Sequence, residues 1–265
     1  HDAEFKVFSQ FGDDGIIQYL INNIEIEERT FIEFGVENYT ESNTRFLLIN
    51  NNWKGLVMDG SAAHIEYIKS DSIYWRHELT AVHGFIDKEN VNGLISDNGF
   101  SGALGILSID IDGNDYWIWE CIREVEPAIV IIEYNSVFGK SRAITIPYDA
   151  AFNRTRAHPS NLYWGASLRA MCLLAEKKGY VFVGSNSSGN NAYFVRKDKL
   201  GPIRALDPES GYVKSRFRES LDEHGRLTYL SDAERLKAIE EMIVYDLEKE
   251  SLVKIKSLDA VASGS

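Results

Sequence analysis

Only two cysteines, Cys121 and Cys172, occur among 265 residues. Both lie in amphipathic helical patterns among large apolar residues, which favours buried free thiols over a disulfide or a catalytic pair. No apolar run approaches the roughly 18 to 20 residues that span a bilayer. The first residues also lack the basic and then apolar pattern of a signal peptide. These absences predict a soluble, cytoplasmic protein without a transmembrane segment.

Basic residues are also scarce, with 28 Lys and Arg against 40 Asp and Glu and a formal net charge of -12. The excess of acidic residues argues against a nucleic-acid partner, because phosphate binding needs a basic surface that releases counterions. A chain with this net charge can still have a local basic pocket for a small anionic molecule. With 44% hydrophobic residues the chain can bury a sizeable core, and one α/β domain is the natural expectation.

Five strand-like runs alternate with helical patterns in the first half of the chain. A helix is expected from Asp13, and the strand-like runs cover 30–34, 55–60, 80–85, 106–111 and 128–135. This alternation indicates βαβ units and a mostly parallel sheet with helices on both faces. After a helix over 166–179, the runs 180–185 and 191–196 flank a turn cluster and predict an antiparallel hairpin.

The chain after residue 200 has a different character. We expect an α/β domain over 1–200, with an N-terminal helix, and a C-terminal extension over 201–265. The apolar spacing over 232–252 predicts a terminal helix that packs on the domain or on a second subunit, which would make a homodimer. The long segment 138–163 is basic and aromatic, and such a connection is typical of an active-site loop.

Acidic residues follow four of the predicted strands. They are Glu33, Asp59, Asp110 with Asp112, and Glu133. Ligands bind beyond the carboxyl ends of strands in such sheets, and clustered like charges need a ligand, proton or cation between them. Asp110, Asp112, Glu133 and Asn135 offer hard oxygen ligands that suit Mg²⁺. The alternative is that residues 112–115 only turn the chain and cap the next helix.

The turn after the first strand lacks the GxGxxG pattern, and only Gly35 stands there. NAD is therefore disfavoured, since a diphosphate needs close backbone approach. Asp59 lies 24 positions after Gly35, close to the roughly 20-residue offset of a ribose-binding acid. S-adenosylmethionine carries no phosphate and fits this pattern better.

The strings SQFGDDGIIQYL, FIEFGVENYTESNTRFLL, LSIDIDGNDYWIWECI and IVIIEYNSVFG resemble methyltransferases of the FkbM type, which are associated with surface-polysaccharide biosynthesis. The resemblance runs from about Ser9 to Arg196. It implies the Rossmann-like class I methyltransferase fold, with seven strands of which the last is antiparallel. It also implies S-adenosylmethionine contacts, which fall here on Gln10, Glu33, Gly35, Asn43, Asp59, Asp87 and Asp110.

Transfer of a methyl group to an alcohol requires an aligned acceptor and a group that takes its proton. Asp110, Glu133 and His158 are the candidate catalytic residues, and the histidine lies in the long basic loop. Arg142, Arg154 and Arg156 suit an anionic acceptor such as a sugar phosphate, and Tyr163 suits contact with a sugar. The alternative for these arginines is a solvated charged loop.

The leading interpretation is an O-methyltransferase that uses S-adenosylmethionine, with Mg²⁺ as a candidate cofactor. Its acceptor is expected to be a carbohydrate-linked or phosphate-containing small molecule in capsular or other surface-polysaccharide biosynthesis. Two alternatives stay open: a non-catalytic binding or scaffold module with the same fold, and an NAD-dependent oxidoreductase.

Overall fold

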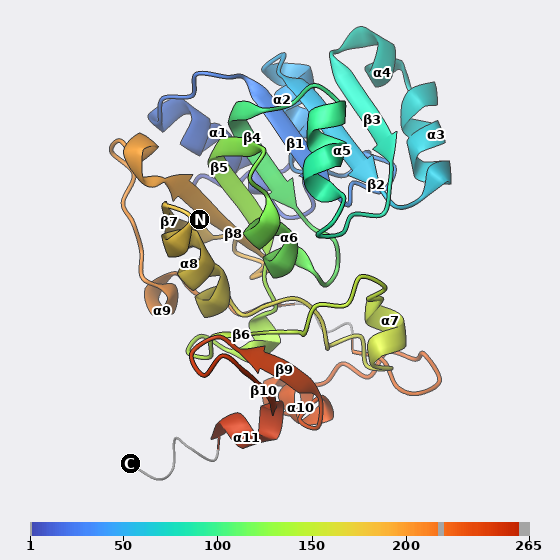
Figure 1. Cartoon of the computed structure of the whole chain (residues 1–265), viewed down its shortest axis with the longest axis vertical. Coiled ribbons are helices and arrows are strands. Elements are labelled where there is room, and N and C mark those ends of the chain that lie inside the picture. The colour runs from blue at the N-terminus through green and yellow to red at the C-terminus, as the bar shows by residue number, and fades with distance from the viewer. Residues whose placement is uncertain (1, 217–219, 260–265) are drawn as a thin grey trace.

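The computed structural model describes residues 2–216 and 220–259, and a seven-stranded sheet forms its centre (Figure 1). The strand order is β3-β2-β1-β4-β5-β8-β7. Strands β3 to β5 in this order run parallel, and β8 is antiparallel to both β5 and β7. The expected Rossmann-like sheet with a C-terminal antiparallel hairpin is confirmed. The strands are β1 (Thr30–Phe34), β2 (Lys54–Asp59), β3 (Leu79–His83), β4 (Gly102–Ile109), β5 (Val125–Glu133), β7 (Tyr180–Ser185) and β8 (Asn191–Arg196).

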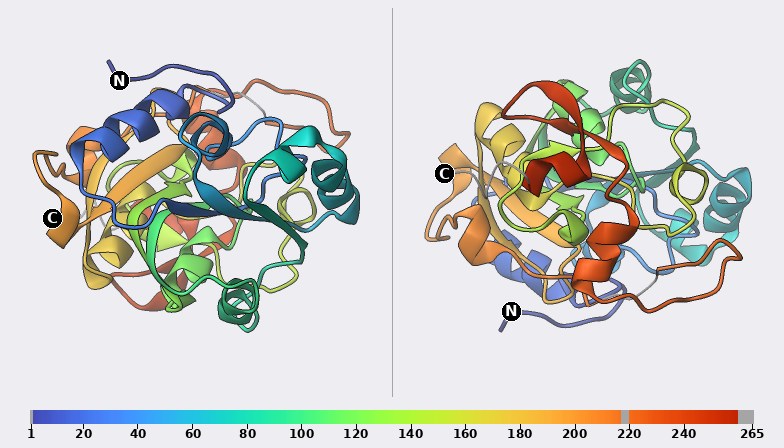
Figure 2. Two further views of the ribbon diagram at one scale, coloured as in Figure 1. Left: turned by 90° about the horizontal axis from the view of Figure 1, so that it is seen from above. Right: turned by 90° about the horizontal axis from the view of Figure 1, so that it is seen from below.

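Helices cover both faces of this sheet, as the view from above shows (Figure 2, left). Side chains alternate along a strand, so Phe31 packs toward one layer of helices while Ile32 and Phe34 pack toward the other. The first layer holds α1 (Asp13–Asn23), α2 (Arg45–Asn50), α3 (Ala62–Ser70) and α4 (Ser72–Arg76). The second holds α5 (Val91–Asp97), α6 (Asp115–Cys121) and α8 (Leu168–Lys177).

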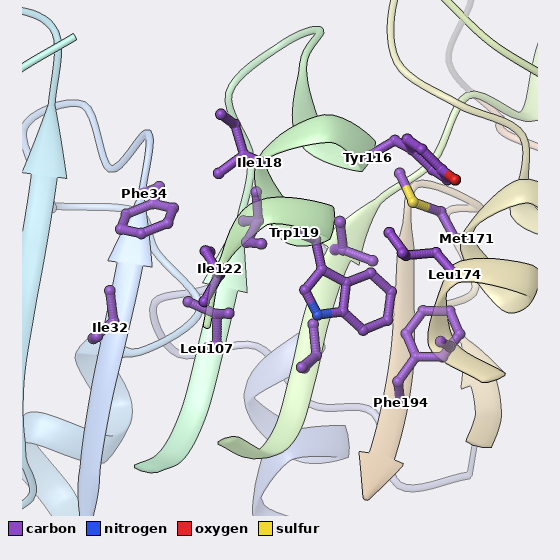
Figure 3. Close-up of a cluster of buried hydrophobic side chains, with 14 of the residues drawn as sticks. Ile32, Phe34, Leu107, Tyr116, Ile118, Trp119, Ile122, Met171, Leu174 and Phe194 are labelled. Atoms are coloured by element: carbon purple, nitrogen blue, oxygen red, sulfur yellow. The ribbon is translucent and has the colours of Figure 1, made fainter. Parts of the chain in front are cut away.

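The second layer forms the larger apolar cluster. Trp119 of α6 is fully buried and contacts the ring of Phe194 at a centroid distance of 5.1 Å. Met171 and Leu174 of α8 reach the same cluster (Figure 3). Burial of such side chains stabilises the domain by about 1.5 to 3 kcal/mol each. Of the helices in the described ranges, none has the length and apolar character to cross a bilayer.

A small antiparallel sheet lies beyond the main sheet, at the lower end of Figure 1. Its order is β10-β9-β6, from β6 (Ile144–Thr145), β9 (Ile243–Asp246) and β10 (Ser251–Lys254). It has its own apolar cluster. The remaining short elements are η1 (Ser136–Phe138), α7 (Arg154–Ala157), η2 (Lys197–Lys199), α9 (Pro208–Gly211), α10 (Asp232–Ala238) and α11 (Ile255–Asp259). The C-terminal segment therefore pairs with the loop that follows β5.

The single terminal helix predicted over 232–252 is wrong. A capping box between Ser231 and Glu234 starts α10, but the helix ends at Ala238 and the chain turns into the β9–β10 hairpin. Pairing of β9 with β6 overrides the helical spacing, and the β-branched Ile243 and Val244 suit a strand. Residues 217–219 and 260–265 of the expected extension lie outside the described residues, and a homodimer stays a prediction.

Candidate active site

A cavity of about 540 Å³ opens at the carboxyl ends of the parallel strands. Many of the residues singled out from the sequence line it together. They are Gln10, Glu33, Gly35, Asn43, Asp59, Asp110, Asp112, Glu133, Asn135 and Arg154. The topology explains this convergence, because β1, β2, β4 and β5 are neighbours whose ends meet at one edge of the sheet.

Gly35 allows the ends of β1 and β4 to approach closely. Its φ of 72° lies in the left-handed region, and a Cβ atom there would come within 1.6 Å of the carbonyl oxygen of Asp110. An L side chain would clash with the backbone. The glycine is therefore required by the cavity floor, and the sequence-based assignment of Gly35 to the site fits its position.

Glu33 shapes the cavity wall through a buried carboxylate. Its oxygens accept hydrogen bonds from the Ser42 hydroxyl (2.8 Å), the backbone N–H of Asn43 (2.9 Å), and both the N–H (3.1 Å) and hydroxyl (2.5 Å) of Thr44. Burial raises the pKa of Glu33. Since these amides stand just before α2, the carboxylate occupies donors that a diphosphate would need.

Asp59 holds the turn after β2 and keeps acceptor capacity. One oxygen accepts from the N–H of Glu37 (2.8 Å), and the other accepts from the N–H of Ser61 (2.8 Å) and lies 3.1 Å from His64 Nδ1. A carboxylate has about four acceptor positions. Three are used here, so one acceptor position remains on this cavity-lining residue.

Asp110, Asp112 and Glu133 form an acidic cluster in which one carboxylate oxygen from each lies within 4.8 Å of the others. Burial and the neighbouring negative charges raise the pKa of Asp110 and of Glu133 well above their usual range. Arg154 Nη1 lies 3.0 Å from Asp112 Oδ1 and offsets part of this charge. The cluster can therefore accept a proton or a cation.

The turn 111–115 serves the local fold as well. Asp115 is fully buried and accepts from the N–H groups of Ile111 and Gly113, each at 2.9 Å. Burial raises the pKa of Asp115 to about 6. Because Asp115 makes these contacts, Asp110 and Asp112 are left to face the cavity.

Asn135 lines the cavity, and its side-chain amide is bonded to backbone groups of the protein. Its Oδ1 accepts from the N–H of Val137 (3.0 Å), and its Nδ2 donates to the carbonyls of Leu162 and Trp164, both at 2.9 Å. The amide connects η1 to the long loop.

The loop after β5 supplies an aromatic and basic wall. The Arg154 guanidinium lies 4.7 Å from the centre of the Trp164 ring and donates through Nε to the Asn161 carbonyl at 2.7 Å. Phe152 packs where Gly113 has no side chain, since a Cβ on Gly113 would come within 2.3 Å of its ring. Phe152, Arg154 and Trp164 all line the cavity.

Several predicted site residues do not line the cavity, and Asp87 is one of them. Asp87 accepts from the N–H groups of Glu89 (3.0 Å) and Asn90 (2.8 Å) and so begins the turn into α5. Its neighbours Phe85 and Ile86 line the cavity in its place. Asp87 was expected at the cofactor from the resemblance, whereas here its carboxylate is bonded within the local turn.

His158, Arg142, Arg156 and Tyr163 are also absent from the lining. His158 Nδ1 lies 2.7 Å from the Ser160 hydroxyl, and burial lowers the pKa of this histidine. Arg142 donates to the Phe138 carbonyl at 3.1 Å, and Arg156 is exposed on α7. The buried Tyr163 donates to the carbonyl of Ile243 at 2.5 Å and ties the loop to β9.

The sequence analysis missed residues from two later segments. Asn190 and Asn191 come from the β7–β8 hairpin, while Ser215 and Arg235 come from the C-terminal segment. Because β8 runs antiparallel, its first residue lies at the carboxyl edge of the parallel strands. The predicted hairpin was therefore sufficient to place Asn191 near the site. The placement of Ser215 and Arg235 depends on tertiary packing alone.

No protein-family profile and no curated protein sequence matches the chain. Among solved structures, the N-terminal domain of EvdMO1 with SAH (S-adenosylhomocysteine) bound is 9% identical over 72% of this chain and 81% of that chain, with a TM-score of 0.45. A SAM-dependent methyltransferase from Aquifex aeolicus is 8% identical over 69% and 88%, with a TM-score of 0.42. An O-methyltransferase from Bacillus cereus in complex with SAH is 13% identical over 69% and 80%, with a TM-score of 0.40.

Proposed function

We propose that the protein is an S-adenosylmethionine-dependent O-methyltransferase. The observation that carries this proposal is the charge of the cavity at the strand ends. Two arginines, Arg154 and Arg235, line it against the carboxylates of Glu33, Glu37, Glu41, Asp59, Asp110, Asp112 and Glu133. Such a site favours a cofactor with a cationic sulfur and disfavours a dinucleotide with its diphosphate. The amides before α2, already bonded to Glu33, support the same choice.

The cofactor would lie across the ends of β1, β2 and β4. The remaining acceptor position of Asp59 suits a ribose hydroxyl, and Gln10 and Asn43 suit the methionine end. Phe85 and Ile86 follow β3, next to β2, and suit the adenine ring. S-adenosylmethionine supplies an electrophilic methyl group, whose bond to sulfur breaks as the acceptor oxygen forms its new bond to carbon.

The acidic cluster would handle the acceptor's proton. Asp110 or Glu133 takes the hydroxyl proton as the oxygen attacks, and their raised pKa values increase their basicity once ionised. Mg²⁺ is a second element of the proposal, because three carboxylates meet its preference for hard oxygen ligands. When bound by Asp110, Asp112 and Glu133, it would stabilise negative charge on the acceptor oxygen.

The acceptor is proposed to be carbohydrate-linked or phosphate-containing, and to belong to capsular or other surface-polysaccharide biosynthesis. The Arg154–Trp164 pair supports this choice, because an aromatic ring suits a sugar face and a guanidinium suits an anionic group. Both side chains line the cavity on the side of the loop that follows β5.

Calorimetric titration with S-adenosylhomocysteine tests the proposal. Wild type should bind saturably, and Asp59→Ala should weaken binding by about tenfold or more, as expected for a lost charged hydrogen bond. Asp87→Ala is the matched control, because Asp87 follows the next strand but does not line the cavity. Titrations with and without Mg²⁺, repeated on Glu133→Gln, test the metal. Absence of saturable binding by wild type would refute the methyltransferase proposal.

A further inference from the structure

The turn between β7 and β8 is built by asparagine side chains. Asn186 is fully buried, and its Oδ1 accepts from the N–H groups of Gly189 (3.1 Å), Asn190 (3.2 Å) and Asn191 (3.3 Å). Asn190 and Asn191 are 8% and 6% exposed, and both line the cavity. The turn therefore presents two well-held amides to the proposed active site.

Asp13 at the start of α1 determines which way these amides point. Its Oδ1 accepts from Nδ2 of Asn186 and of Asn191, each at 3.0 Å, and from the Tyr193 hydroxyl. An amide nitrogen donates and an amide oxygen accepts, so Asn191 must turn its Nδ2 toward Asp13. Asn186 Nδ2 also donates to Asn190 Oδ1 at 2.8 Å. Each amide has one atom committed to this network.

The other atom of each amide is available to a ligand. Within residues 2–216 and 220–259, no hydrogen bond engages Asn190 Nδ2 or Asn191 Oδ1, and neither atom belongs to the enclosed polar atoms that lack a partner. Since both residues line the cavity, these atoms offer it one donor and one acceptor.

This pair lies beside the acidic cluster. Asn191 is the register partner of Glu133 across β5 and β8. Paired residues in antiparallel strands present their side chains on one face, with Cβ atoms about 5 Å apart. Residues two apart on a strand share a face. Ile131 lies two residues before Glu133, Tyr193 lies two residues after Asn191, and both pack in the apolar cluster of α1. The amides are thus adjacent to a residue proposed to take the acceptor's proton.

We propose that Asn190 and Asn191 form a hydroxyl-binding site that recognises a sugar with two neighbouring ring hydroxyls. The inference rests on the proposed methyltransferase function and identifies the part of the acceptor that the two amides bind. Asn190 Nδ2 donates to one hydroxyl oxygen, and Asn191 Oδ1 accepts from the next hydroxyl. A vicinal diol offers both an acceptor and a donor, whereas a phosphate dianion only accepts and would match Asn190 alone.

The test measures sugar binding to protein saturated with S-adenosylhomocysteine. The probes are the methyl α-pyranosides of D-glucose, D-galactose and D-mannose. Their binding is measured by titration with saturation-transfer NMR. Wild type should bind at least one of them. The 3-deoxy analogue of methyl glucopyranoside, which has no two neighbouring ring hydroxyls, should bind more weakly than its parent.

Asn190→Asp is the diagnostic variant, because it retains the oxygen bonded to Asn186 and replaces the cavity-facing donor by a negatively charged acceptor. It should weaken sugar binding by about fivefold or more while the affinity for S-adenosylhomocysteine stays within about threefold. Ser187→Ala is the control in the same turn, since this side chain does not line the cavity. It should leave both affinities unchanged.

The outcomes separate this inference from the function on which it rests. Binding of S-adenosylhomocysteine without any pyranoside, or sugar binding unaffected by Asn190→Asp, would overturn the inference and leave the cofactor assignment intact. Failure to bind S-adenosylhomocysteine would overturn both. If Asn190→Asp does not fold, the comparison of the 3-deoxy sugar with its parent on wild type decides.

Discussion

Gly35→Ala should damage both stability and the active site, because two separate costs meet at this residue. The left-handed φ of 72° costs a non-glycine residue about 1 to 2 kcal/mol. The added Cβ would stand 1.6 Å from the Asp110 carbonyl oxygen, so the ends of β1 and β4 must separate. Forcing extra volume into a packed site costs about 1 to 3 kcal/mol.

The two costs together predict a loss of roughly 2 to 5 kcal/mol in the free energy of unfolding. For a chain of this size that is a fall in melting temperature of roughly 5 to 15 °C. Urea unfolding followed by circular dichroism measures the loss, and titration with S-adenosylhomocysteine should show weaker binding in the same variant. The shifted carbonyl belongs to Asp110, which lines the proposed cofactor cavity.

A matched control separates backbone strain from the clash. Gly99 also has a positive φ, 81°, but a Cβ there would meet no atom within 4 Å. Gly99→Ala should therefore cost only the strain of about 1 to 2 kcal/mol and leave ligand binding unchanged. Equal losses in the two variants would refute the argument that contact between β1 and β4 requires Gly35.

Three further outcomes are expected. Burial raises the pKa of the Cys172 thiol to about 12 and also raises the pKa of Cys121. A thiol reagent at pH 8 should therefore modify neither cysteine in the native protein and both after unfolding. Fast labelling of the native protein would contradict this expectation. Tyr163→Phe leaves the Ile243 carbonyl without its donor and should lower the free energy of unfolding by about 1 kcal/mol, with no change in S-adenosylhomocysteine affinity. The native pKa of Asp115, about 6, lies above its ordinary value of 3.8, so ionisation of this residue destabilises the fold as pH rises through that window, by about 3 kcal/mol. Urea unfolding from pH 4 to 7 should show that Asp115→Asn loses this part of the pH dependence, and an unchanged slope would count against it.

Patterns within short stretches predicted most of the main sheet. Alternation of apolar runs with amphipathic helices placed β1 to β5, and the turn cluster between 185 and 191 placed the hairpin at the bounds that the structure has. The helix expected over 232–252 failed, because the pairing of β9 with β6 involves residues about 100 positions apart. Local spacing carries no information about such a partner.

In the candidate site, too, some residues were predictable from local sequence and others were not. Strand-end residues such as Glu33, Asp59 and Asp110 were predictable, because parallel strands bring their carboxyl ends to one edge whatever the loops do. In the long loop, Arg154 was predicted and lines the cavity, but His158 and Arg156 do not. Their side-chain chemistry suggested them, and that chemistry does not say which way packing directs a side chain.

The sequence by itself therefore determined the order of strands and helices, the acidic edge of the sheet and the need for glycine after β1. Only the tertiary structure decided which of the polar side chains are already used by the protein. Asn135, Asp87 and Tyr163 satisfy nearby backbone groups, whereas Asn190 and Asn191 keep one polar atom toward the cavity. The physical reason is that every buried donor and acceptor needs a partner, and the partner is found in three dimensions rather than along the chain.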